Sequence, residues 1–219
     1  MLSVVIPTLN AEAHLGATLD AVREADEIVV VDGGSSDYTI EVAARREVVL
    51  LCAATGRGHQ LIAGAEAAGG DWLLFLHADT RLSPGWRKAA EQHMKAEPER
   101  AACFRFHLAS AAWQARLIER GVALRTRLLG LPYGDQGLLV PRRLYDALNG
   151  YSSLQLMEDV DFVRRIGKAR LRLLAADAVT SAERWEKDGW FRRSARNLAC
   201  LAAYYAGAPP GRLVRLYSG

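Results

Sequence analysis

The chain has 219 residues, of which 50% are hydrophobic and 24% are charged, and its formal net charge is +3. This balance is typical of a single globular domain, and it excludes collagen-like, disordered and disulfide-dense classes. So small a net charge does not indicate a nucleic-acid-binding protein. The three cysteines form no CxxC pair. They suit a reducing cytoplasm and argue against a structural zinc site.

Neither a signal peptide nor a membrane span is predicted. The first ten residues, MLSVVIPTLN, have no basic region ahead of their apolar stretch. The longest apolar run, LACLAAYYAGA, is far shorter than the roughly 20 residues that a spanning helix needs. We therefore expect a cytoplasmic protein.

The first half of the chain alternates apolar segments with helical patterns. Four segments are apolar throughout and predict buried parallel strands: Leu2–Ile6, Ile28–Val31, Val48–Leu51 and Trp72–Leu76. Between them, Ala- and Leu-rich patterns predict helices at Ala11–Glu24, Asp37–Arg45 and His59–Ala68. This order indicates right-handed βαβ crossovers around an open sheet.

Capping residues indicate where helices begin. Asn10 is the expected N-cap of the first helix, and Ser36 or Asp37 that of the second. Ser83 followed by Pro84 predicts a further helix, with serine as its N-cap and proline at its first position.

The second half is less regular. A strand is expected at Ala101–Leu108 and another at Leu171–Ala175, with a short apolar run at Leu138–Val140. Helices are expected at Trp113–Leu129 and Asp159–Ile166, separated by segments that include the turn-rich patch Gly130–Gly137. A basic and aromatic segment, Arg184–Arg196, leads into a helix through Tyr205 that Pro209-Pro210 stops.

Three polar segments follow predicted strands: Pro7–Glu12, Asp32–Asp37 and His77–Thr80. Ligands of an open parallel sheet bind beyond the carboxyl ends of its strands, so these segments are expected to converge. The common nucleotide and hydrolase motifs are absent. Gly56-Arg57-Gly58 lacks the third glycine of GxGxxG, and the sequence contains no P-loop, nucleophile elbow or HExxH motif.

The openings VVIPTLNAE and VVVDGGSSDYT, followed by FLHADT, resemble segments of glycosyltransferase family 2, which has the GT-A fold. Later, YGDQG at Tyr133–Gly137 and LMEDVDF at Leu156–Phe162 resemble the acceptor-side segment and the Glu-Asp catalytic motif of that family. These five motifs run in family order from residue 2 to about 165. The HADT and GDQ forms together resemble the bacterial radical-SAM/selenodomain-associated transferase 2 subgroup.

The resemblance implies an α/β fold of the GT-A type, with an open, mostly parallel sheet. The chain would be one domain, with a Rossmann-like nucleotide-sugar-binding half at residues 1–98. An irregular acceptor half with a C-terminal helix would occupy residues 99–219. The implied function is an inverting, metal-dependent transfer of a sugar from a nucleotide-diphosphate donor, with a UDP-sugar favoured. Neither the sugar nor the acceptor can be identified from these motifs.

The resemblance also implies which residues contact the donor. Asp79 is expected to hold Mg²⁺ or Mn²⁺, because a hard cation prefers carboxylate and phosphate oxygens. His77 stands where the family usually has the first Asp of its metal signature, so the affinity for metal is expected to be low. Asp32 is expected near the base and Arg57 near the phosphates. The full set at the nucleotide-sugar is Pro7, Thr8, Asn10, Glu12, Asp32, Arg57, Gln60, His77, Ala78 and Asp79.

Several of these residues also have a simple structural interpretation. Asp32 can form an Asx turn and Asp37 can cap a helix. Glu12 can favour a helix N-terminus, and Arg57 can be a solvated side chain.

Asp159 is the expected catalytic base, which would take the proton of the attacking acceptor hydroxyl. Glu158, Asp159 and Asp161 place three acids within four residues, so their mutual repulsion is expected to raise one pKa. The alternative is a solvated acidic helix start. Glu158, Asp135 and Gln136 are expected on the acceptor side, although a plain turn also explains the last two.

Two other functions fit part of the pattern. A nucleotidyltransferase shares the α/β layout, but it usually has a Gly-rich basic segment after the first strand, where this chain has PTLNAE. A non-catalytic nucleotide-sugar-binding protein is supported only by the replacement at His77.

Two stretches combine basic and aromatic residues, Trp113–Leu131 and Arg184–Arg196. Either is compatible with peripheral contact with an anionic membrane surface. A helix that covers the domain with a solvated outer face is the simpler explanation, and the sequence favours it.

Overall fold

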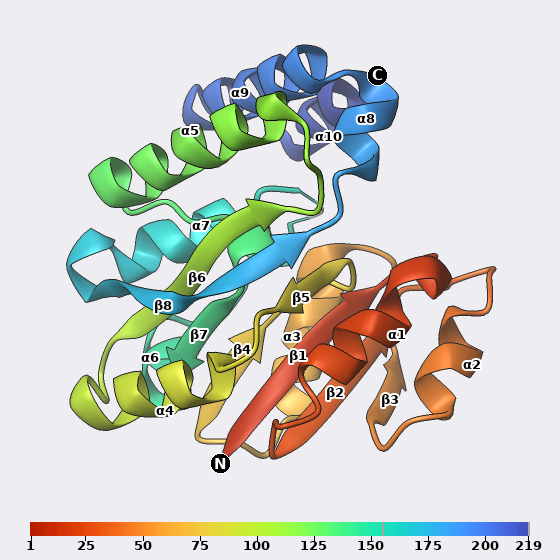
Figure 1. The fold of residues 1–219 in the computed structure, drawn as a ribbon, viewed down its shortest axis with the longest axis vertical. Coiled ribbons are helices and arrows are strands. Elements are labelled where there is room, and N and C mark those ends of the chain that lie inside the picture. The colour runs from red at the N-terminus through yellow and green to blue at the C-terminus, as the bar shows by residue number, and fades with distance from the viewer. Residues whose placement is uncertain (155, 219) are drawn as a thin grey trace.

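The computed structural model describes residues 1–154 and 156–218, which form one eight-stranded sheet flanked by helices (Figure 1). Across the sheet the strand order is β3-β2-β1-β4-β7-β6-β8-β5. The strands are β1 (Leu2–Thr8), β2 (Glu27–Asp32), β3 (Val49–Cys52), β4 (Trp72–Phe75), β5 (Thr80–Leu82), β6 (Ala101–Leu108), β7 (Leu138–Pro141) and β8 (Leu171–Thr180).

Helices connect and cover these strands. They are α1 (Glu12–Ala21), α2 (Thr39–Ala44), α3 (Arg57–Ala67), α4 (Trp86–Ala96), α5 (Trp113–Leu129), α6 (Arg142–Ala147), α7 (Glu158–Ile166), α8 (Glu183–Asp188), α9 (Trp190–Tyr205) and α10 (Pro210–Ser218). Two short 3₁₀ turns, η1 (Gly134–Gln136) and η2 (Lys168–Arg170), lie on either side of α7 in the chain. No described helix is long and apolar enough to cross a membrane.

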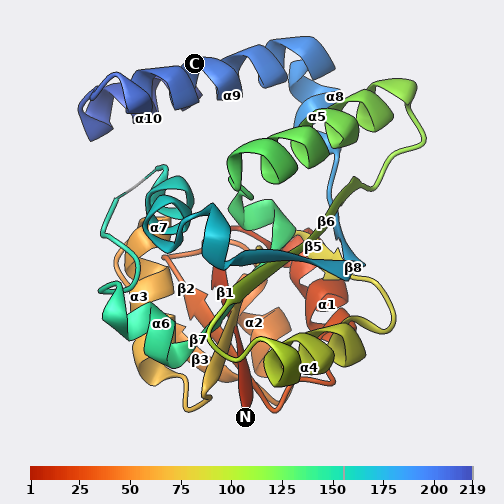
Figure 2. The same ribbon diagram turned by 90° about the vertical axis from the view of Figure 1, so that its left-hand side faces the viewer.

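The four strands of the first half are parallel, as predicted. They are apolar on both faces because each face is covered. Val4 and Ile6 of β1 belong to the core cluster that includes α1 and α4, whereas Val5 belongs to the cluster that includes α3, α6 and α7. The approach of α3 depends on Gly64, where a Cβ atom would overlap Val5. Figure 2 shows the sheet between these two helix layers.

The second half adds a mixed part to the sheet. Strand β7 is antiparallel to both β4 and β6, while β8 is parallel to β6. The predicted bounds of Ala101–Leu108 and Trp113–Leu129 agree with β6 and α5. The architecture is the open, mostly parallel α/β sheet that the sequence predicted.

The predicted N-caps are wrong. Asn10 has a left-handed backbone (φ 50°) and precedes the N-cap of α1, which is Ala11. Its Oδ1 instead accepts a hydrogen bond from the backbone N–H of Ser36. The second helix has Tyr38 at its N-cap, so neither Ser36 nor Asp37 occupies that position. Asn10 and Ser36 tie two loops together. Asp37 stands one residue before the N-cap of α2, and its carboxylate accepts the N–H groups of Thr39 and Glu12, the first residues of α2 and α1.

Other boundaries also need correction. Helix α4 begins at Trp86 rather than at Pro84, because Gly85 adopts a left-handed conformation (φ 85°) between them. The final strand continues to Thr180, and α8 takes up part of the segment that was expected to lead into a helix. Pro210 begins α10, an unpredicted helix, which suits a residue without an N–H to donate. Strand β5 was also not predicted.

Helices α5, α8, α9 and α10 lie beyond the carboxyl ends of β1 and β4 (Figures 1 and 2). A third core cluster anchors this layer. It joins Phe106 and Leu108 of β6 to Val122 of α5 and to Trp185 of α8. The layer thus covers the edge of the sheet where ligands of such folds bind.

Candidate functional site

Two adjoining cavities lie at the carboxyl edge of the parallel strands. The larger, of about 460 Å³, lies among the ends of β1 and β4, the start of α3 and the segment before α8. The smaller, of about 110 Å³, lies among η1, the start of α7 and helices α8, α9 and α10. They share a wall formed by Arg57, His77, Asp79, Ser181 and Arg184.

The larger cavity brings together most of the residues expected at the donor. Segments Pro7–Glu12 and His77–Thr80 do converge there, whereas no residue of Asp32–Asp37 lines either cavity. The expected residues on its wall are Pro7, Thr8, Asn10, Arg57, Gln60, His77, Ala78 and Asp79.

Asp32 holds the second loop together and does not face a cavity. It is 1% exposed, and its carboxylate accepts hydrogen bonds from the backbone N–H groups of Gly34 and Ser35 and from the hydroxyls of Ser35 and Thr8. The hydrogen bonds lower the pKa of Asp32 even though burial, the largest single influence, would raise it. Asp32 therefore forms the turn of the Asx interpretation. Its expected contact with a base stays a prediction.

Glu12 likewise belongs to the loop framework. Its Oε2 accepts the backbone N–H of Tyr38, while Asp37 accepts the backbone N–H of Glu12. Gln60 is 4% exposed and donates from Nε2 to the carbonyls of Thr8 and Val31, so it ties the ends of β1 and β2 to α3. Glu12 lines neither cavity, and Gln60 shapes the wall of the larger one.

Asp159 lines the smaller cavity and not the larger one. Its Oδ2 accepts the backbone N–H of Gly134 at 2.9 Å, and its Oδ1 accepts that of Val160 at 2.7 Å. The residue before α7, Met157, has a left-handed backbone (φ 67°), which is costly for a side chain of this kind. A carboxylate has about four lone-pair sites, so Asp159 retains acceptor capacity toward the cavity.

Glu158 is placed differently from its neighbour. Its side chain is 1% exposed, Oε1 pairs with Arg57 Nη1 at 3.3 Å, and Oε2 has no hydrogen-bond partner. Burial first, and then the charge of Asp159, raise its pKa to about 7. The expected rise of one pKa in this acidic motif is thus found at Glu158, with burial as the larger cause. Glu158 lines neither cavity and supports Arg57 through this ion pair. Its expected contact with the acceptor stays a prediction.

Asp135 and Gln136 of η1 also differ in their surroundings, because only Asp135 lines a cavity. Gln136 is 1% exposed and is bonded to Thr126 and to the carbonyl of Phe104, so it holds η1 against α5 and β6. Its expected contact with the acceptor stays a prediction. Asp135 lines the smaller cavity, and its buried Oδ1 has no hydrogen-bond partner. Burial raises its pKa to about 6, with the charges of Asp159 and Asp79 acting in the same direction.

His77 stands in the shared wall as a neutral imidazole at pH 7. Burial, reinforced by the positive charge of Arg57, lowers its pKa to about 4. Gly134 packs against this ring so closely that a Cβ at position 134 would overlap Nε2.

Asp79 is the residue best suited to a divalent cation. Its carboxylate lines both cavities, and the only side-chain hydrogen bond described for it is a long one, 3.4 Å, from Thr80. Among the described residues, no three His, Cys, Asp or Glu side chains form a group suited to a metal. The chemistry of Asp79 therefore fits a cation that draws its other oxygens from a phosphate ligand and water.

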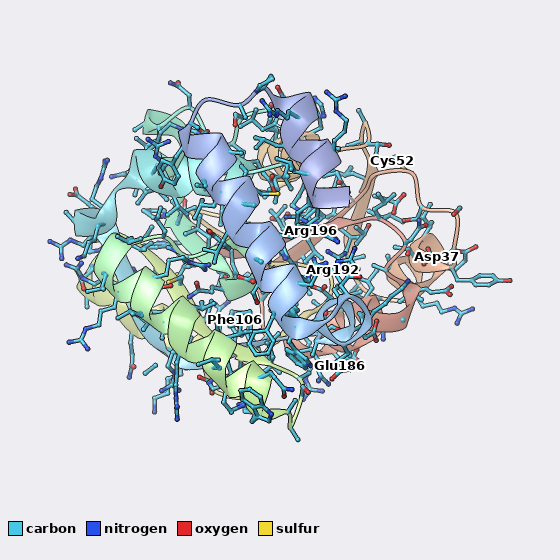
Figure 3. The ribbon with its side chains drawn as sticks, turned by 90° about the horizontal axis from the view of Figure 1, so that it is seen from above. Asp37, Cys52, Phe106, Glu186, Arg192 and Arg196 are labelled. Carbon is cyan, nitrogen blue, oxygen red and sulfur yellow. The ribbon has the colours of Figure 1, made fainter. Side chains whose placement is uncertain are left out.

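Several residues of the smaller cavity were not predicted. Trp185 Nε1, Arg193 Nε and Asn197 Oδ1 are buried without a hydrogen-bond partner, and all three residues line it. Arg193 and Asn197 are four residues apart and share the inner face of α9, which Figure 3 shows crossing the top of the molecule. Ser181 and Arg184 follow the end of β8, at Thr180. Because the predicted strand ended at Ala175, these two residues were not expected at the edge of the sheet.

Comparisons with known proteins agree with this architecture. The sequence model of a family described as Glycosyl transferase family 2 matches residues 3–130. A PGL/p-HBAD biosynthesis glycosyltransferase of Mycobacterium tuberculosis is 38% identical over 93 residues, which covers 37% of this chain and 36% of that protein. An uncharacterized glycosyltransferase of Haemophilus influenzae is 25% identical over 191 residues, covering 76% of this chain and 62% of its own. The chain thus matches about a third of the length of its mycobacterial relatives.

Two solved structures illustrate the similarity in fold. The structure of S. aureus TarS 1–349 has a TM-score of 0.65 and 16% identity, covering 99% of this chain and 69% of that one. Glucosyl-3-phosphoglycerate synthase from Mycobacterium tuberculosis, in complex with Mn²⁺, UDP-glucose and phosphoglyceric acid, has a TM-score of 0.57 and 20% identity. That match covers 79% of this chain and 68% of the synthase. Both likenesses support the GT-A type of fold.

Proposed function

The chain belongs to glycosyltransferase family 2, and on that premise we propose that it is an inverting enzyme that transfers a sugar from a nucleotide-diphosphate donor to a hydroxyl acceptor. The observation that carries the proposal is the pair of adjoining cavities. Asp79 stands in the wall they share, whereas Asp159 lines only the smaller one. A transfer reaction needs this arrangement, with one ligand on each side of the reacting centre.

The larger cavity is the proposed donor site. Its polar backbone edges at Pro7–Asn10 and its arginines Arg57 and Arg184 suit a nucleoside diphosphate. Arg57 is a cation at any physiological pH, and its guanidinium is held in the cavity wall by the ion pair with Glu158. Support for a uridine donor comes from the glucosyl-3-phosphoglycerate synthase structure with UDP-glucose and from a TarS structure with UDP.

Asp79 is the proposed metal-binding residue. A Mg²⁺ or Mn²⁺ ion bound there would act as a Lewis acid for the diphosphate leaving group. The Mn²⁺ named with UDP-glucose in the synthase structure supports a divalent ion as the cofactor. His77 would contribute little to binding a hard cation, since a neutral imidazole is a poor substitute for a second carboxylate.

The smaller cavity is the proposed acceptor site, with Asp159 as the base. As the acceptor oxygen forms its bond to the anomeric carbon, its proton passes to Asp159 and the bond to the nucleotide diphosphate breaks. This single displacement inverts the configuration at the anomeric carbon. Trp185 and Arg193 have free N–H groups, and Asn197 and Asp135 have free oxygens, so this cavity can bind an acceptor with several polar groups.

Measurement of free nucleotide after incubation with UDP- and GDP-sugars, with and without Mn²⁺, tests the proposal. A glycosyltransferase releases the nucleoside diphosphate in the presence of a suitable acceptor. A nucleotidyltransferase would require a triphosphate and release pyrophosphate, and a non-catalytic binding protein would bind the donor without turnover. Either of the last two results would contradict the proposal.

A further inference from the structure

Helices α5 and α9 expose a continuous apolar face. On α5 the exposed residues Trp113, Leu124 and Leu128 fall within about 60° of one another around the helix axis. On α9, Phe191, Leu198 and Tyr205 are each seven residues apart and share one side of the helix. The two helices lie side by side (Figure 3), and the rings of Trp113 and Phe191 are 6.2 Å apart between centroids.

The chain concentrates its positive charge on the helices of this layer. Helices α5, α9 and α10 together contain nine arginines and one acidic residue, Glu119. That glutamate is 9% exposed and accepts the backbone N–H of Leu108, so it contributes little negative charge to the surface. The rest of the chain has 19 basic and 24 acidic residues, so its formal charge is negative.

The basic residues lie along the edge of the apolar face. Arg116, Arg120 and Arg127 of α5 are exposed and follow one another at helical spacing beside the apolar stripe. The adjacent α8 contains three acids and two basic residues, Arg184 and Lys187, so its formal charge is only −1. Glu183 pairs with His14, and Asp188 pairs with Arg193. Glu186, near the end of α9 in Figure 3, accepts the hydroxyl of Ser110.

A groove of about 540 Å³ borders the same face between α5, α7 and α9. Leu129, Leu131 and Leu201 contribute apolar walls, and Arg164 and Lys168 are its charged residues. Tyr205 belongs both to the groove and to the exposed stripe of α9.

We propose that the face formed by α5 and α9 docks on the surface of an anionic lipid bilayer. The exposed Trp, Phe and Leu side chains would enter the boundary between headgroups and acyl chains, and the flanking arginines would lie at the level of the phosphates. A protein partner or a second copy of the chain would also cover apolar residues, but it would not require exposed arginines without an exposed acid on the same helices. The exposed arginines of α5, α9 and α10 are Arg116, Arg120, Arg127, Arg192, Arg212 and Arg215. Charge complementarity therefore selects anionic lipid.

Co-sedimentation of the full chain with vesicles tests this inference. Binding is expected to vesicles of phosphatidylcholine with phosphatidylglycerol, to weaken as salt rises, and to be at least about tenfold weaker with phosphatidylcholine alone. Arg120→Glu with Arg127→Glu should reduce the binding to anionic vesicles by at least about tenfold. Leu124→Ser with Leu198→Ser should also reduce it, because both leucines are more than half exposed and their loss leaves the core intact.

Matched variants on other surfaces provide the controls. Arg23→Glu with Arg45→Glu changes the net charge equally at exposed positions outside this face and should leave binding nearly unchanged. Leu173→Ser removes a leucine that is 52% exposed on β8 and should also leave it nearly unchanged. If the charge control loses as much vesicle binding as Arg120→Glu with Arg127→Glu, binding depends only on the net charge of the chain, and the proposal is overturned. Absence of vesicle binding would also overturn it, as would light scattering that shows a dimer disrupted by the Leu124 and Leu198 variants. Donor binding is measured separately on the same variants, and none of these results alters the test of the proposed function.

Discussion

The backbone N–H of Gly134 donates a 2.9 Å hydrogen bond to Oδ2 of Asp159. The same glycine lies against His77, where any Cβ at position 134 would overlap Nε2 of the imidazole. One small residue therefore sets the distance between the wall shared by the two cavities and the carboxylate proposed as the base.

We expect Gly134→Ala to lower the rate of transfer by about 10- to 100-fold. The added methyl group must displace either the imidazole of His77 or the backbone N–H of residue 134 that donates to Asp159. His77→Ala alone should have a small effect. The double variant, Gly134→Ala with His77→Ala, should recover most of the lost rate, since the truncated His77 leaves room for the methyl group. Steady-state rates for the parent and the three variants complete the double-mutant cycle. If the double variant is no better than Gly134→Ala, contact with His77 is not the cause.

Asp159→Asn should lower turnover by roughly 10²- to 10⁴-fold, because an amide of the same size cannot accept the proton of the acceptor. Donor affinity should remain unchanged, since Asp159 does not line the larger cavity. The transfer rate and the calorimetric affinity for the donor are measured on the same preparations. Asp146→Asn, at an exposed position of α6, is the control and should alter neither value. Survival of turnover would rule out Asp159 as the base, and loss of donor affinity would merge the two proposed sites.

Asp79→Ala should abolish the Mn²⁺-dependent part of nucleoside diphosphate binding while leaving the fold intact, because the carboxylate has little other bonding. Thermal unfolding with UDP, with and without Mn²⁺, is the measurement. In the parent, a ligand at 100 times its dissociation constant adds about 2.7 kcal/mol of stability. His77→Ala should preserve the effect of Mn²⁺. An equal loss in both variants would identify His77 as a direct ligand.

Glu158 should make stability depend on pH. Its pKa is raised from an ordinary value of 4.5 to about 7, so the folded chain holds a proton that the unfolded chain has released within that window. Its contribution to stability is complete below pH 4.5 and is lost as the pH rises to about 7. Glu158→Gln should remove this loss. Between pH 4.5 and 8, the free energy of unfolding of the variant, relative to that of the parent, should therefore rise by at most about 3 kcal/mol.

Urea unfolding at several pH values measures the effect of Glu158→Gln. Glu41→Gln, at an exposed position of α2, is the control and should give the pH profile of the parent. Asp135, with a pKa near 6, contributes a loss of the same sign that remains in both variants. A variant that follows the parent at every pH would show that Arg57 fully compensates the charge of Glu158.

The parallel half of the fold could be predicted because its information is local. Segments such as Leu2–Ile6 are apolar on both faces, and only a sheet covered on both sides accommodates them. The meeting of Pro7–Glu12 and His77–Thr80 at the larger cavity could also be predicted, because both segments follow parallel strands. The N-cap at Asn10 was wrong because Asn10 bonds to Ser36, 26 positions away, and such a pairing leaves no trace in a short sequence window. Asp37 was misplaced by one position, since it bonds both to nearby Thr39 and to distant Glu12.

The sequence could not show which of two adjacent residues faces a cavity and which one is buried. Glu158 and Asp159 are neighbours in the sequence, yet one is buried against Arg57 and the other faces a cavity. Asp135 and Gln136 differ in the same way. A helix start or a 3₁₀ turn points consecutive side chains in different directions, and only tertiary packing decides which one meets solvent.

The wall shared by the two cavities has a kinetic consequence. A donor that contacts Arg57, His77 or Asp79 from the larger cavity immobilises part of the surface that receives the second substrate in the smaller one. Binding of either ligand must then change the affinity for the other by the same factor. Initial-rate plots should intersect rather than run parallel, as for a ternary complex. A nucleoside diphosphate left behind after transfer should also alter how readily the glycosylated product departs.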